Sequence, residues 1–203
     1  MKNARQYLDN RLNSILPQVG IDNWEFILKI HRELIKGFPL SKSEYYKIAE
    51  LSNDKADVIL QKMGEVDAVG NVVAFAGLSV VPTTHRFEVN GKALYTWCVI
   101  DAILFTDWLD VNAHITSADP IDHSSIELEI DDNRLLWTKP YPLFISWVET
   151  IDTCNIRGSL CNHVSFFASE STANQWLKNN DGGKILSIDD FFTTDADISL
   201  KCC

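Results

Sequence analysis

The stretch that decides the fold is FEVNGKALYTWCVIDAILF, which occupies residues 87–105. Asn90-Gly91 is a strong signal for a tight hairpin turn, and short runs of strand-forming residues stand on either side of it. The apolar segment 95–105 then predicts a compact helix with the Thr96 hydroxyl as its N-terminal cap. The sequence therefore predicts a β-hairpin that leads directly into a buried helix.

Upstream of the hairpin, the sequence predicts three helices followed by further strands. Gly37 ends the first helix, and Ser52 or Asn53 caps the third. The alternating pattern of side chains in residues 72–81 predicts strands. Three short helices before strands suggest a winged-helix arrangement, but the third helix lacks the basic excess that DNA binding needs. The helices are expected at Trp24–Ile35, Ser43–Leu51 and Asp54–Met63.

Downstream of residue 105, short strand-like runs alternate with turn signals. Asp131-Asp132-Asn133 is typical of a tight turn between two strands. We expect strands at Ala113–Thr116, Ser125–Ile130, Arg134–Thr138, Leu143–Val148 and Leu160–Phe167, a helix at Thr172–Asn179 and a closing segment at Ile185–Phe192.

Together these elements predict an α+β fold in two parts. Residues 1–81 are expected to form a three-helix winged-helix-like domain, and residues 82–203 a mixed domain of antiparallel strands and helices that carries the candidate site. The tail after Thr194 is expected to be loose. The strands between residues 72 and 89 suit either part, so the boundary between the two expected domains is approximate.

Charge and hydropathy exclude several classes of protein. The net charge of −10 argues against a general role in binding nucleic acid, which needs a basic surface. No apolar run approaches the roughly 20 residues that a membrane helix requires. The N-terminus begins with MKNAR, continues polar and lacks the apolar core of a secretory signal. We therefore expect a cytoplasmic protein with neither a membrane nor a nucleic-acid partner.

The five cysteines do not form a disulfide or zinc pattern. Their number is odd, the expected compartment is reducing, and no Cys-x-x-Cys pair occurs. Each cysteine is therefore interpreted singly, and Cys154, in an expected loop, receives no role. The cysteines are Cys98, Cys154, Cys161, Cys202 and Cys203.

Cys98 and Asp101 are three residues apart on the expected helix, so their side chains share one face. Cys98 is expected near the helix N-terminus, where the macrodipole lowers the pKa of a thiol. Free cysteines are commonly small core residues, which is the simpler interpretation of Cys98. Asp101 resists that interpretation, because a carboxylate in so apolar a helix is unfavourable unless it is paired or functional.

Cys161 falls in the strand-like run 160–167. Strand alternation places Cys161, His163 and Ser165 on one face, opposite an apolar face. This gives a polar stripe that carries a thiol. We interpret His163 as a hydrogen-bonded structural histidine in preference to a metal ligand.

Two segments resemble the active-site segments of the organomercurial lyases, also called alkylmercury lyases. Residues 95–105 are similar to the first of these, an aromatic-x-Trp-Cys-x-x-Asp helix, and residues 160–169 resemble the second, a Cys-x-His-Val-x-Phe-Phe-Ala-Ser run. With the helix that contains Trp176 and the segment 185–187, the similarity covers about residues 87–192. The N-terminal helices match the family's winged-helix-like domain through weaker motifs.

The resemblance implies a mechanism and a set of partners. Cys98 and Cys161 would be the two thiols that bind mercury, a soft metal that prefers sulfur. Asp101 would help to deprotonate a thiol and then deliver the proton to carbon. Organomercury is the implied substrate, and Hg(II) held by the two cysteines is the product. The resemblance implies that no organic cofactor is required. It also implies that small thiols are needed for turnover, and that Hg(II) is transferred to those thiols or to a mercuric reductase.

The sequence departs from the family pattern at two positions. Asn162 stands where many members have a second, adjacent cysteine, and Asp119 stands near the place of another cysteine that looks structural in the family. These departures leave the three implied site residues intact. A separate hypothesis is that Cys202 and Cys203 capture Hg(II) from the site. The alternative is that this pair of cysteines belongs to a tail without function.

Three other interpretations remain open. A thiol-based heavy-metal-binding protein of the same fold would share Cys98 and Cys161 but would not need Asp101, which makes Asp101 the discriminating residue. A transcription regulator built on the winged helix is disfavoured by the acidic charge. A family member that acts on another substrate would keep all three residues.

Overall fold

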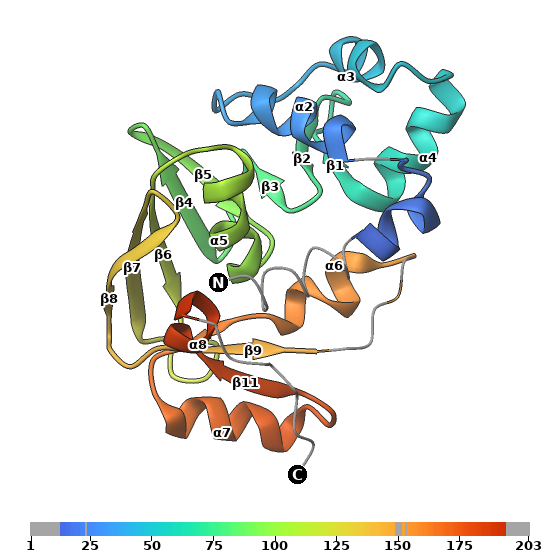
Figure 1. The fold of residues 1–203 in the computed structure, drawn as a ribbon. Helices are drawn as coiled ribbons and strands as arrows, with labels where there is room; N and C mark the ends of the chain where they lie inside the picture. The colour runs from blue at the N-terminus through green and yellow to red at the C-terminus, as the bar shows by residue number, and fades with distance from the viewer. Residues whose placement is uncertain (1–12, 23, 149–151, 153, 194–203) are drawn as a thin grey trace.

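The computed structural model describes residues 13–22, 24–148, 152 and 154–193. It confirms a mixed α and β architecture. Helices gather at one end of the molecule, a long antiparallel sheet lies beside them, and a small sheet with its own helix forms the other end (Figure 1). No helix among the described residues is long and apolar enough to cross a membrane.

The N-terminal helices lie close to their predicted positions. They are α2 (Trp24–Leu34), α3 (Lys42–Ala49) and α4 (Asn53–Met63), and residues 13–19 form a further helical segment. The Ser41 side chain accepts a hydrogen bond from the Glu44 backbone N–H, and the Glu44 carboxylate accepts one from the Ser41 backbone N–H, so a capping box starts α3. Ile27, Ile30 and Leu34 of α2 are fully buried against the core.

The main sheet has eight antiparallel strands in the order β1-β2-β3-β5-β4-β6-β7-β8. The predicted hairpin is confirmed, because Val89 pairs with Lys92 across Asn90 and Gly91, which both have positive φ. The strands are β1 (Gly64–Val66), β2 (Val72–Phe75), β3 (Leu78–Ser79), β4 (His85–Val89), β5 (Lys92–Thr96), β6 (Ala113–Ala118), β7 (Ser125–Asp131) and β8 (Arg134–Lys139).

A second sheet of three antiparallel strands follows in the chain, in the order β10-β9-β11. Phe167, Ala173 and Trp176 form a small core of their own under α7, beside the main core that joins the other elements. The elements are β9 (Phe144–Trp147), β10 (Phe166–Phe167), α7 (Glu170–Asn179), β11 (Lys184–Ser187) and α8 (Ile188–Thr193).

The start of the central helix differs from the prediction. Helix α5 spans Val99–Trp108, and Cys98 is its N-cap, not Thr96. Residues 95 and 96 pair with β4 instead and belong to β5. The Thr96 hydroxyl donates to the Cys98 carbonyl at 2.8 Å, which holds the junction between strand and helix. The apolar residues before Cys98 suit a strand as well as a helix, and the hairpin partner decides between the two.

The segment around Cys161 is also not the predicted strand. Residues 156–159 form the short helix α6 (Ile156–Ser159), capped by the Asn155 side chain, and a 3-10 turn, η1 (Cys161–His163), follows directly. Only residues 166 and 167 pair as a strand. The alternation of Cys161, His163 and Ser165 is therefore not a strand face. Cys161 is buried, whereas His163 and Ser165 are partly exposed.

Asp119 links the two sheets. It is fully buried at the end of β6, and its carboxylate accepts hydrogen bonds from the Ile121 and Ala168 backbone N–H groups, both at 2.8 Å, and from the Thr172 hydroxyl at 2.6 Å. These bonds join the turn after β6 to the start of α7. Asp119, which stands near the place where the resemblance implied a structural cysteine, is therefore part of a buried polar network.

We expect Asp119→Ala to lower the free energy of unfolding by about 3 kcal/mol, because it leaves buried donors without an acceptor. Urea unfolding measures this loss. Asp122→Ala is the matched control, since Asp122 is exposed and its carboxylate accepts a hydrogen bond from the Ser124 backbone N–H, two residues away. Equal stability of the two variants would contradict a structural role for Asp119.

Candidate functional site

Three side chains from two distant parts of the chain meet where the start of α5 approaches η1. Cys98 is the N-cap of α5, Asp101 lies in its first turn, and Cys161 begins η1. One ligand atom of each side chain, two sulfurs and a carboxylate oxygen, lies within 4.8 Å of the others. The structure therefore brings together all three residues that the sequence singled out.

The local backbone holds Asp101 toward Cys98. The Cys98 backbone N–H donates to Asp101 Oδ2 at 3.2 Å, which satisfies one of the free donors at the start of α5. Both cysteines are buried, with 3% of Cys98 and 5% of Cys161 exposed. Asp101 keeps partial access to a cavity, although protein atoms enclose it on most sides.

Burial sets the protonation states of the site. Removal from bulk water raises the pKa of Asp101 from 3.8 to about 7, although hydrogen bonds from Cys98 oppose the rise. Burial also raises the pKa of the Cys98 thiol well above its ordinary value, with further contributions from Cys161 and Asp101. The sequence predicted a lowered pKa for Cys98, and this is wrong. The helix terminus is present, but desolvation and the neighbouring carboxyl outweigh it.

We expect Asp101→Asn to stabilise the protein at pH 8 and to change its stability little near pH 4. In wild type the folded state holds a proton on Asp101 between pH 3.8 and about 7, whereas the unfolded chain has released it. Stability is therefore lost as pH rises through this window, by on the order of 2–4 kcal/mol. Urea unfolding of both proteins at the two pH values measures the difference, and a difference independent of pH would contradict the raised pKa.

Gly77 packs against the Asp101 carboxyl group, a role that the sequence analysis missed. It lies in the tight turn between β2 and β3 with φ of +99°, and a Cβ there would stand 2.6 Å from Asp101 Cγ. The Gly77 carbonyl accepts a hydrogen bond from the Trp97 backbone N–H at 2.8 Å. Only glycine combines this backbone conformation with so close an approach. Ala76-Gly77 between two apolar runs was the available turn signal.

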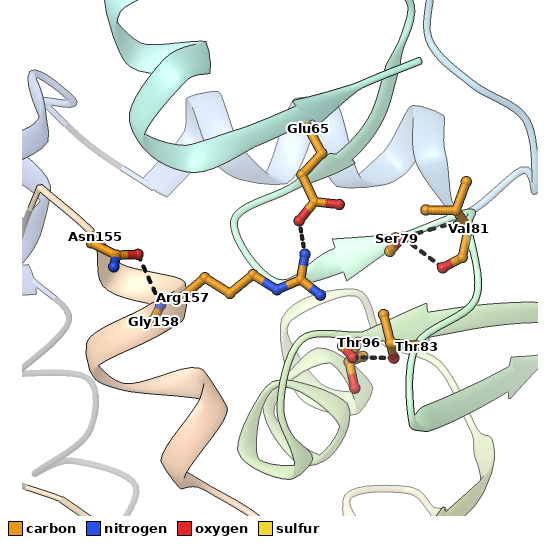
Figure 2. A network of polar contacts seen from close by, with 8 residues as sticks. All are labelled: Glu65, Ser79, Val81, Thr83, Thr96, Asn155, Arg157 and Gly158. Atoms are coloured by element: carbon orange, nitrogen blue, oxygen red, sulfur yellow. Dashed lines mark hydrogen bonds and ion pairs between the residues drawn. The ribbon is translucent and has the colours of Figure 1, made fainter. Parts of the chain in front are cut away.

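Arg157 connects the site to the N-terminal strands, and the sequence analysis missed it too. Figure 2 shows its side chain reaching from α6 to the Glu65 carboxylate on β1, with which it forms an ion pair. The guanidinium also lies 5.3 Å from the centre of the Trp97 ring. Trp97 precedes Cys98, and Arg157 lies four residues before Cys161. These contacts therefore tie the two cysteine-bearing segments to each other and to β1.

Two cavities adjoin Cys161. One, of about 50 Å³, reaches Asp101 and Cys161 and has an almost entirely apolar lining, which includes Trp24, Ile27, Met63, Trp108 and Leu160. The other, of about 420 Å³, also reaches Cys161; its lining is about half polar and half apolar, and because it is far more polar than the first it is called the polar cavity. A small apolar group thus has a place beside the carboxyl, and a larger polar group has a place beside the second thiol.

Cys154 and His163 are not members of this cluster. Cys154 is exposed and Cys202 and Cys203 fall outside the described residues. The His163 carbonyl accepts a hydrogen bond from the Ser146 hydroxyl at 2.8 Å. Two sulfurs and one carboxylate oxygen suit a soft, thiophilic metal far better than a hard cation, which prefers oxygen alone.

Comparisons with known proteins point to one family. The family model MerB, described as alkylmercury lyase, matches residues 78–198. An alkylmercury lyase of Staphylococcus epidermidis is 30% identical over 195 residues, which cover 95% of this chain and 89% of that protein. One of Pseudomonas putida is 31% identical over 163 residues, 79% of this chain and 76% of that protein.

A solved structure described as the mercury-bound form of MerB2 has a similar fold. Its TM-score is 0.74 at 19% identity, and the match covers 88% of this chain and 92% of that one. At this level of identity the match supports the fold alone.

Proposed function

This chain belongs to the alkylmercury lyase family, and we propose that it cleaves the carbon–mercury bond of organomercury compounds by protonolysis. The products are a hydrocarbon and Hg(II), in a reaction that serves mercury detoxification. The observation that carries the proposal is the cluster of Cys98, Cys161 and a carboxyl group whose pKa is about 7.

The proposed reaction uses the protons of the two thiols. One cysteine sulfur binds the mercury of R–Hg–X, and X leaves with that thiol's proton. The second sulfur binds as Asp101 accepts its proton. Donation from two sulfurs raises the electron density on the bound carbon. Asp101 then gives the proton to carbon as the carbon–mercury bond breaks, which leaves R–H and Hg(II) on Cys98 and Cys161.

The pKa of Asp101 suits both halves of its proposed task. A group that titrates near 7 is present in both protonation states at neutral pH, so it can accept the proton that a thiol loses on binding mercury and then give that proton to carbon. The cavity of about 50 Å³ beside Asp101 accommodates a small alkyl group on mercury. In this arrangement the carbon to be protonated lies beside the carboxyl group, away from bulk water.

Gly77→Ala tests the position of the carboxyl group. The added Cβ would overlap Asp101, so we expect hydrocarbon formation from methylmercury to fall about a hundredfold, as for a reacting group misplaced by about 1 Å. Gly91→Ala is the matched control, because Gly91 also has positive φ, +73°, but an added Cβ there meets nothing within 4 Å. Equal activity of both variants would contradict the role of Gly77.

The experiment that tests the function is gas chromatography of the headspace above methylmercury, purified protein and excess small thiol. We expect methane to form catalytically with wild type and to be absent with Cys98→Ser. Tight mercury binding without methane above the thiol-only blank would favour the alternative, a heavy-metal-binding protein of the same fold.

Several accompanying features belong to the same proposal. We propose that the reaction needs no organic cofactor, that small thiols remove Hg(II), and that a mercuric reductase is a further acceptor. We also propose a cytoplasmic location. Helices α2 to α4 with the first strands would form the winged-helix-like domain of residues 1–81, and residues 82–203 would form the catalytic domain.

A further inference from the structure

The larger cavity beside Cys161 has no part in the proposed cleavage. Its volume of about 420 Å³ lies in the range of small-molecule sites. Three separate parts of the chain contribute polar side chains to it: the segment before β4, the turn after β6 and the segment from α6 to residue 165. These polar side chains include Thr84, Arg157 and Asn162.

The two cavities share only two lining residues, Trp97 and Cys161. Asp101 lines the small apolar cavity and not the polar one. Mercury on Cys161 is therefore approached from two different environments. The apolar one holds the carboxyl group that acts on carbon, and the polar one, about 420 Å³ against about 50 Å³, has room for a larger and hydrated ligand.

We infer that the polar cavity binds a small hydrophilic thiol, with amide or carboxylate groups, which takes Hg(II) from Cys161 after cleavage. The inference rests on the proposed function. The thiol's sulfur forms a bond to mercury as the bond from mercury to Cys161 breaks, and the thiol's proton passes to the Cys161 sulfur. A second thiol frees Cys98 in the same way, so the products are Hg(SR)₂ and two cysteine thiols.

The lining favours such a ligand over an apolar one. Thr84 and Asn162 are exposed at the cavity and offer a hydroxyl and an amide. Arg157 adds a guanidinium, whose five N–H donors exceed what its Glu65 partner can occupy.

Thr84→Trp tests this site, because Thr84 is exposed, lies outside the cysteine cluster and would fill the cavity with an indole. Hg(II) is first generated on the full-length protein by one turnover of methylmercury without added thiol, and the methane is counted. Release of Hg(II) is then followed by rapid ultrafiltration at rising concentrations of N-acetylcysteine. Parallel runs use 2-mercaptoethanol at equal thiolate concentration, and Thr84→Ser is the matched control that leaves the cavity open.

We expect release by N-acetylcysteine to saturate with wild type and with Thr84→Ser. With Thr84→Trp it should be at least about tenfold slower and should no longer saturate, while release by 2-mercaptoethanol changes less than about twofold. Release that rises linearly in wild type would overturn the inference, and so would equal slowing of both thiols in the variant. A first step that yields no methane from wild type would instead contradict the proposed function.

Discussion

Replacing Asp101 by Asn is expected to lower the rate of methane formation from methylmercury by about 10²- to 10⁴-fold, while the protein still binds Hg(II). The amide keeps the shape of the side chain and can still accept the Cys98 backbone N–H, but it cannot carry the proton from thiol to carbon. Headspace methane and mercury retained after gel filtration measure the two properties on the same sample.

Asp110→Asn is the control for this substitution. Asp110 is exposed just after α5 and its left-handed backbone, with φ of 52°, suits asparagine. It should leave both properties unchanged. Methane formation by Asp101→Asn at the wild-type rate would remove the carboxyl group from the mechanism, and parallel loss of mercury binding would make Asp101 mainly a ligand.

The second large effect is expected for the cysteines. Cys161→Ser should reduce methane formation by on the order of 10³-fold or more, because a hydroxyl is a far poorer ligand for a soft metal than a thiolate. Since the site residues act as a unit, the loss of one of them removes most of the rate enhancement. Hg(II) should also exchange faster from this variant, since one sulfur ligand has gone. Stopped-flow transfer of Hg(II) to a chromogenic thiol measures the exchange.

Cys154→Ser provides the matched control, since Cys154 is an exposed free cysteine outside the cluster. This variant should retain full activity, and Hg(II) should exchange from it as slowly as from wild type. If Cys161→Ser and Cys154→Ser behaved alike, the two buried thiols would not be the mercury ligands of the reaction.

Much of the fold could be predicted because its signals are local. Asn90-Gly91 fixed the hairpin through turn chemistry, and the N-terminal helices followed from apolar spacing. The errors arose where local signals were ambiguous. Residues 95 and 96 suit strand and helix alike, and pairing with β4 decides. The period-two pattern at 161–165 coincided with a strand pattern, yet the chain turns there as η1.

The site could be predicted only in part. Spacing along one helix related Cys98 to Asp101, but Cys161 lies 60 residues beyond Asp101 and joined them only through the resemblance to a family. Gly77 and Arg157 act through contacts between elements, which no single segment reveals. The direction of the Cys98 pKa shift also depends on burial, which the sequence does not display.

The measurement that tests the central claim most directly is mass spectrometry of the methane that the protein releases from methylmercury in D₂O. Protonolysis by a solvent-exchangeable proton carried from thiol to carbon predicts CH₃D, formed catalytically with wild type and at least about a hundredfold more slowly with Asp101→Asn. Undeuterated methane would contradict the proposed path of the proton. Stoichiometric mercury binding without any methane would contradict the assignment of lyase activity itself.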